Sequence, residues 1–173
     1  MAETLRDRLQ WQTSHGQIMD ADRRYLLMRT DVLMGAFREL PPEARQQAFA
    51  ALARSANQGG GASTRAYFQS LQGDVSALLN TMTAYSAELG WGVWSFSRDA
   101  QAHEIHLKVH NSPFAAGFGA SDCPVCHPIA GILQTVGELA LGQPASVQET
   151  CCSAQGHAHC EFHIHALPAP ASQ

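Results

Sequence analysis

Apolar residues recur at helical spacing through the first half of the chain. One helix is expected from about Thr30 to Leu40, and Pro41-Pro42 ends it. The Gly59–Gly61 run predicts a break between the helices that follow. Those further helices are expected over residues 43–56, 63–71 and 74–89.

From Gly90 the apolar period changes from that of a helix to that of a strand. Residues 91–96 and 103–110 alternate in polarity and predict a β-hairpin, with Trp91 and Trp94 on opposite faces. Residues 111–127 read as a loop, whose first part, 111–120, is a candidate lid. A helix over 128–141 and strands beginning near 147 and over 160–165 complete the pattern.

This order of elements predicts an α/β (α+β) fold in which N-terminal helices pack on an antiparallel sheet of four or five strands. We expect one domain over residues 1–173. Residues 1–19 are expected to form an N-terminal extension, with a frayed helix over 1–11, and 168–173 a flexible tail. The run 24–29 suits either a strand or a helix start.

Charge and hydropathy exclude several classes of partner. The 173 residues carry 11 Lys and Arg against 15 Asp and Glu, a net charge of −4, without a basic cluster, so nucleic acid is not an expected partner. No apolar run reaches the ~18 residues of a membrane span. The N-terminus does not resemble a signal peptide, so we expect a cytoplasmic protein. The alanine-rich helices carry few charges, which predicts burial against a second copy in a homodimer.

All five cysteines fall between Cys123 and Cys160. A turn between two strands would bring Cys152 and Cys160 together, with Cys126 supplied from the loop before the last helix. With Glu149, these make a closed tetrahedral shell suited to Zn²⁺ in a structural role.

Other interpretations of the same cysteines stay open from spacing alone. An all-thiolate shell would use Cys123 in place of Glu149. Thiols that are simply buried are a second alternative. A redox Cys-x-x-Cys pair is disfavoured, because Pro128 places the helix start beyond both cysteines.

Several of these residues together resemble the 4-vinyl reductase (hydrocarbon-binding) domain family. The resemblance rests on Asn111-Ser-Pro-Phe114, Cys126, Gly131 and the pattern Glu149-x-x-Cys152-x-x-x-Gly156-x-x-x-Cys160. That family includes the sensor domains of phenol- and xylene-responsive regulators. The resemblance implies a fold similar to TRAPP subunits and heme-based nitric oxide sensors.

The resemblance also implies the ligand set for the metal. It assigns zinc to Cys126, Glu149, Cys152 and Cys160, and leaves Cys123 and Cys151 as additional thiols. No ATPase domain or DNA-binding helix pair accompanies these motifs, so the chain is similar to the sensor module alone.

The resemblance further implies a ligand pocket between the helices and the sheet. Ligand sites are mostly apolar with a few polar groups, and His106 is a candidate polar contact. Each candidate aromatic residue could equally be part of an ordinary core. The aromatic candidates are Tyr67, Tyr85, Trp94, Phe96, Phe114 and Phe118.

The leading hypothesis is a zinc-containing binding module for a hydrophobic, aromatic or tetrapyrrole-like molecule, acting as a sensor or carrier. It would present its ligand or its state to a partner protein. One alternative is an accessory protein or reductase in (bacterio)chlorophyll biosynthesis, and another is a ligand-free interaction scaffold. No dinucleotide motif, flavin motif or nucleophile–base pair is visible, which favours a protein that is not an enzyme.

Overall fold

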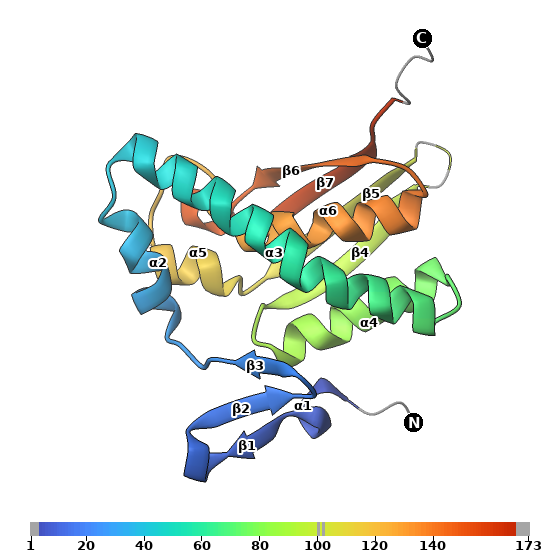
Figure 1. Ribbon diagram of the computed structural model, residues 1–173. Coiled ribbons are helices and arrows are strands. Elements are labelled where there is room, and N and C mark those ends of the chain that lie inside the picture. Colours follow the sequence, from blue (N-terminus) through green and yellow to red (C-terminus); the bar gives the residue numbers. More distant parts are fainter. Residues whose placement is uncertain (1–3, 100, 102, 169–173) are drawn as a thin grey trace.

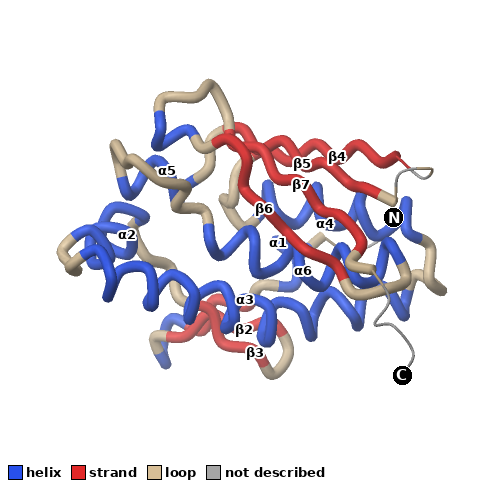
Figure 2. Tube along the Cα trace, turned by 90° about the horizontal axis from the view of Figure 1, so that it is seen from above, coloured by secondary structure: helices blue, strands red, loops and turns tan. Residues whose placement is uncertain are grey.

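A layer of helices covers one face of a four-stranded sheet (Figures 1 and 2). The computed structural model describes residues 4–99, 101 and 103–168, so the tail expected over 168–173 lies outside it except for Pro168. The helices are α1 (Leu5–Arg8), α2 (Thr30–Arg38), α3 (Pro42–Ser70), α4 (Val75–Glu88), α5 (Pro113–Phe118) and α6 (His127–Leu141). The strands are β1 (Gln10–Gln12), β2 (Gln17–Asp20), β3 (Arg23–Tyr25), β4 (Val93–Asp99), β5 (Glu104–His110), β6 (Ala145–Cys151) and β7 (Cys160–Ala166).

The four-stranded sheet is antiparallel throughout, in the order β4-β5-β7-β6. Its strands alternate as expected: Ile105, Leu107 and Val109 are buried on β5, whereas the residues between them are exposed. The buried face packs against α4 and α6, and α3 packs on α6 (Figure 2). The predicted fold class, helices on an antiparallel sheet, is therefore confirmed.

Helix α3 runs without interruption through Gly59–Gly61, so the predicted break there is wrong. A Cβ atom on Gly60 would lie 2.0 Å from Ile132 Cδ1 of α6. A Cβ on Gly131 of α6 would lie 2.2 Å from the carbonyl oxygen of Ala53 in α3. The glycines thus permit the two helices to approach at backbone distance, and this packing outweighs the low helix propensity of glycine.

The N-terminal residues form a small antiparallel sheet of β1, β2 and β3, which the sequence pattern did not predict. Its turns use left-handed backbone at Gly16 (φ 62°) and Ala21 (φ 53°). Arg8 ties the sheet to the helices: it donates to Asp20 at 3.2 Å and to the Tyr85 hydroxyl at 3.0 Å. This sheet lies beside α3 and α4 in Figure 1.

Part of the segment expected as a loop and lid, 111–120, is the short helix α5. Ser112 caps it, and its Phe114 and Phe118 side chains are buried. A Cβ on Gly117 would lie 2.4 Å from the Thr30 carbonyl oxygen, so α5 packs directly against the start of α2. The segment is therefore part of the core.

Candidate functional site

Four potential metal ligands meet where α6 begins and the β6–β7 hairpin turns. Cys126 is the N-cap residue of α6, Cys160 begins β7, and Cys152 follows β6. The β6–β7 register shifts between Glu149 and Cys151, a β-bulge that changes which face the following residues present. As a result Cys152 is fully buried, whereas Cys151 is partly exposed.

The distances in this cluster match those of a tetrahedral metal–thiolate centre. The Cys126 Sγ lies 3.6 Å from Cys160 Sγ and 3.9 Å from Cys152 Sγ, and the last two sulfurs are 4.0 Å apart. Zinc–sulfur bonds of ~2.3 Å would separate the sulfurs of one tetrahedral ion by about 3.8 Å. The ligand atoms of all four residues, Glu149 included, lie within 4.8 Å of one another.

The carboxylate of Glu149 shows the same need for a cation. Its Oε2 accepts a hydrogen bond from the Cys126 backbone N–H at 3.0 Å, while Oε1 is buried without a partner. Burial raises the pKa of Glu149 to about 7. A buried carboxylate oxygen without a hydrogen bond is costly, and a metal ion would satisfy it.

The three thiols cannot all ionise together without a cation. Hydrogen bonds with Cys152 and Cys160, together with burial, raise the pKa of Cys126. Hydrogen bonds from Cys126, Cys152 and the Ser153 backbone lower the pKa of Cys160, so negative charge is held at that sulfur. Three thiolates and a carboxylate carry four negative charges, and a divalent ion would reduce the formal charge of the shell to −2. The residues therefore fit a divalent metal ion.

Cys123, the alternative ligand, lies outside the cluster. Its side chain is exposed, and its nearest polar side chain is Ser121, at 3.7 Å from its Sγ. The structure thus brings together the set that contains Glu149, and it does not bring Cys123 to that set.

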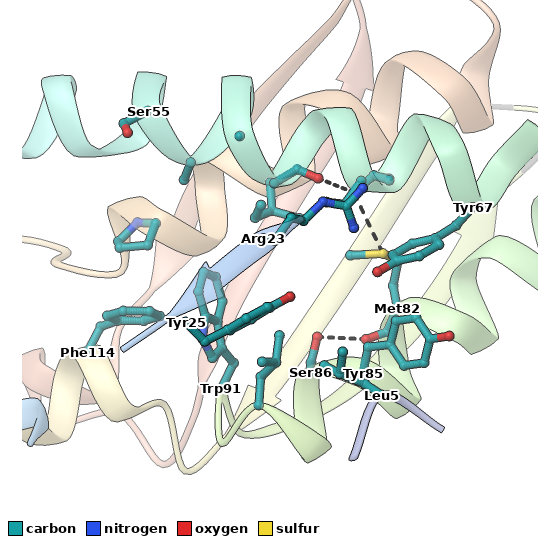
Figure 3. A pocket seen from close by; sticks show the side chains of 18 of the residues that line it. Leu5, Arg23, Tyr25, Ser55, Tyr67, Met82, Tyr85, Ser86, Trp91 and Phe114 are labelled. Carbon is teal, nitrogen blue, oxygen red and sulfur yellow. Dashed lines mark hydrogen bonds between the residues drawn. The ribbon is translucent and has the colours of Figure 1, made fainter. Parts of the chain in front are cut away.

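A separate cavity of about 610 Å³ lies between α3, α4, α6 and the N-terminal sheet. Figure 3 shows Trp91 and Phe114 at one end, Tyr67 and Tyr85 at the other, and Tyr25 between them. The remaining lining residues are mostly apolar or small: Leu5, Arg23, Arg24, Leu33, Leu52, Ser55, Ala56, Gly59, Gly60, Ser63, Thr64, Met82, Ser86, Leu89, Trp94, Pro128 and Ile132.

The polar groups of the cavity are concentrated at the two tyrosines. Arg8 donates to the hydroxyl of Tyr85 at 3.0 Å and to that of Tyr67 at 3.4 Å. Because a tyrosine hydroxyl both donates and accepts, each can still donate its own hydrogen. The cavity therefore combines an apolar body with a polar end, the arrangement typical of small-molecule sites.

Four of the predicted pocket residues line this cavity, namely Tyr67, Tyr85, Trp94 and Phe114, and three do not. Phe96 packs edge-on against Trp94, with ring centroids 5.9 Å apart. Phe118 packs against Phe49, and His106 is exposed on the opposite face of the sheet.

Trp91 and Trp94 both line the cavity, so the expectation of opposite faces is wrong. Strand β4 begins only at Val93, and Gly92 before it adopts φ 94°. A Cβ on Gly92 would lie 2.5 Å from the His110 carbonyl oxygen. This glycine redirects the chain, and strand alternation therefore does not extend back to Trp91.

The sequence analysis missed the contribution of Leu5, Arg23 and Tyr25 to the cavity. These residues come from α1 and β3, elements too short to show a periodic pattern. The only available signal was the apolar run from Tyr25 to Met28, which is unusual beside a polar N-terminus.

Comparison with known proteins places this architecture in a recognised class. The phenol-responsive sensory domain of the transcription activator PoxR, solved with phenol, has a TM-score of 0.75 and 19% identity, over 92% of this chain and 85% of that chain. A trafficking protein particle complex subunit 3 from Naegleria fowleri, covalently bound to palmitic acid, has a TM-score of 0.55 and 8% identity, over 80% of this chain and 95% of that one. A vinyl-4-reductase family protein from Methanocaldococcus jannaschii has a TM-score of 0.49 and 16% identity, over 83% and 98% of the two chains.

The sequence itself also matches a family model. Residues 105–166 match the model of the 4-vinyl reductase domain. This segment holds all four residues of the cysteine–glutamate cluster. The predicted resemblance to the 4-vinyl reductase domain family is thereby confirmed. A search of curated proteins found no significant match.

Within the described part of the chain, no helix combines the length and apolar character that crossing a membrane requires.

Proposed function

We propose that this protein binds a small hydrophobic molecule in the cavity between α3, α4 and the sheet, and acts as a ligand sensor or carrier. The cavity of about 610 Å³, lined by aromatic and aliphatic side chains, is the observation that carries the proposal. Its size falls within the roughly 300–1,000 Å³ range of ligand pockets. Support also comes from two structural neighbours, because one was solved with phenol and the other is bound to palmitic acid.

Ligand binding can be measured through the tryptophans that line the cavity. Titration with alkylphenols and with palmitate, followed by tryptophan fluorescence and native mass spectrometry, is expected to show saturable binding of at least one of these classes. Ala56→Phe places a ring in the cavity and should weaken binding by about tenfold or more, since steric overlap costs of order 1–3 kcal/mol.

Ala62→Phe is the matched control, because Ala62 lies on the same helix but is exposed and does not line the cavity. This variant should bind like the unchanged protein. Absence of binding for every ligand tested, or an equal loss in both variants, would argue against the proposed site.

We further propose that the metal held by Cys126, Glu149, Cys152 and Cys160 is zinc and that its role is structural. Three sulfurs and one carboxylate oxygen fill a tetrahedral shell, leaving no position for water. The sulfur separations of 3.6–4.0 Å and the unpartnered Glu149 Oε1 support this assignment. Because thiolate ligands require reduced cysteines, we expect the protein to function in the cytoplasm.

We also propose a homodimer, formed through the N-terminal sheet and the segment that follows it. The exposed fractions of Leu26 and Leu27 are 77% and 79%, and Trp11 is also exposed nearby. Exposed apolar patches of this kind mark interaction surfaces.

The oligomeric state tests this proposal. Light scattering after size exclusion is expected to give the mass of a dimer, and the double variant Leu26→Glu, Leu27→Glu the mass of a monomer with an unchanged circular dichroism spectrum. Leu167→Glu, at an exposed leucine distant in sequence, should remain dimeric. A monomeric unchanged protein would refute the dimer.

A further inference from the structure

The outer face of the four-stranded sheet carries a group of histidine and glutamate side chains that the cavity and the cysteine cluster do not use. His106 on β5 and His163 on β7 are directly opposed in the strand register. Their rings stack, with centroids 4.4 Å apart. Glu104 is the next residue on the same face of β5. Within the described residues no helix covers this face (Figure 2).

These three side chains place donor atoms at metal-binding separations. Glu104 Oε2 lies 3.1 Å from His163 Nε2 and 3.7 Å from His106 Nε2. The ligand atoms of all three residues lie within 4.8 Å of one another. Metal–nitrogen and metal–oxygen bonds of about 2.0–2.2 Å would separate the donors of one tetrahedral ion by about 3.3 Å.

One of these donor atoms lacks a hydrogen bond. The Nε2 of His163 is buried and has no hydrogen-bond partner, although the Glu104 carboxylate lies close to it. The geometry therefore brings a carboxylate oxygen to an imidazole nitrogen without forming the bond that would satisfy both. A metal ion between them would satisfy the nitrogen and the oxygen together.

The neighbouring charged groups leave this set available. Glu161, the other carboxylate on this part of the face, is already paired with Lys108 at 3.4 Å and with His159 at 2.7 Å. His165 lies next to His163, with ring centroids 5.6 Å apart, and adds a further imidazole. Glu104 is thus the carboxylate that serves the His106–His163 pair.

We propose that Glu104, His106 and His163 form a second metal site, here called the outer histidine site, for a borderline divalent transition-metal ion such as Zn²⁺. Two imidazoles and one carboxylate suit this class of ion. Binding requires the stacked rings to turn about their Cβ–Cγ bonds, because stacked rings direct their lone pairs into parallel planes. The His106 side chain is 52% exposed, which leaves room for this rotation.

The outer histidine site differs in kind from the cysteine cluster. Its ligands project from the exposed face of β5 and β7, whereas Cys160 of β7 is buried. Three protein ligands leave at least one coordination position open toward solvent, for water or for a donor atom from another molecule. The metal here would be exchangeable, whereas the buried cluster encloses its ion.

Cobalt titration of the full chain, with any affinity tag removed, tests the proposal. Thiolate-to-cobalt absorption counts the ions taken up by cysteines, and calorimetry counts all ions bound. We expect one further equivalent of Co²⁺ without thiolate absorption, displaced by Zn²⁺. His106→Gln and His163→Gln should each weaken that equivalent by about tenfold or more, since even outer-shell changes cost 10–100-fold.

His110→Gln is the matched control, because His110 lies on the same strand and the same exposed face. It should leave the further equivalent unchanged. The proposal is overturned if all bound Co²⁺ shows thiolate absorption. It is also overturned if His110→Gln lowers the affinity as much as His163→Gln, which would indicate general binding to a histidine-rich surface.

Discussion

Replacing Cys126 with serine is expected to remove most of the stability of the folded protein together with its metal. Cys126 is buried and connects the start of α6 to the β6–β7 hairpin through the cluster. Structural zinc contributes roughly 10–16 kcal/mol of apparent binding free energy, which equals or exceeds the net stability of about 5–15 kcal/mol of an ordinary domain. Thermal unfolding should show a fall in Tm of about 10 °C or more.

Elemental analysis of the same samples links that loss to metal. The unchanged protein should contain close to one zinc per chain, and Cys126→Ser less than about half. A strong chelator should reproduce the lower Tm in the unchanged protein. If the chelator removes no metal and leaves Tm unchanged, the buried thiols stabilise the fold by packing alone.

Cys123→Ser is the control that separates the two possible ligand sets. Cys123 is exposed and lies outside the cluster, so this variant should keep both its zinc and its Tm. An all-thiolate shell would instead require Cys123 and would lose metal with it. Equal losses in the two serine variants would therefore contradict the role assigned to Glu149.

The elements that the sequence predicted are those whose pattern is local. Alternation along β5 and the proline that starts α6 gave the hairpin and the last helix, and the turn after Glu149 predicted that Cys152 and Cys160 meet. The choice of Glu149 over Cys123 did not follow from spacing. It came from a family resemblance, because the bulge that turns Cys151 outward and Cys152 inward leaves no signal in residue types.

The features that the sequence did not predict depend on contacts between distant segments. Three-residue strands such as β1 and β3 contain less than two periods of alternation, so the N-terminal sheet was missed, and with it the Tyr25 wall of the cavity. The glycines at 59–61 indicate a break only when helix propensity is considered alone. Their function becomes visible when α6 is placed against them.

Gly131→Ala is expected to destabilise the protein by at least about 2 kcal/mol, although alanine is the better helix former. The added Cβ would lie 2.2 Å from the Ala53 carbonyl oxygen, 2.9 Å from its carbonyl carbon and 3.0 Å from its Cα. These atoms are backbone and cannot rotate away, so α3 must move relative to α6. Chemical denaturation measures the loss.

Gly59→Ala is the matched control, since Gly59 lies in α3 and a Cβ there would meet nothing within 4 Å. It should stabilise the protein by roughly 0.5–1 kcal/mol, because alanine loses less backbone entropy in a helix. The same comparison extends to ligand binding: α3 and α6 both line the cavity, through Ala56 and Ile132 among others. Movement of α3 in Gly131→Ala should therefore also weaken ligand binding, whereas Gly59→Ala should leave it unchanged. If the two variants change stability in the same direction, the close packing of α3 on α6 does not set the shape of the cavity.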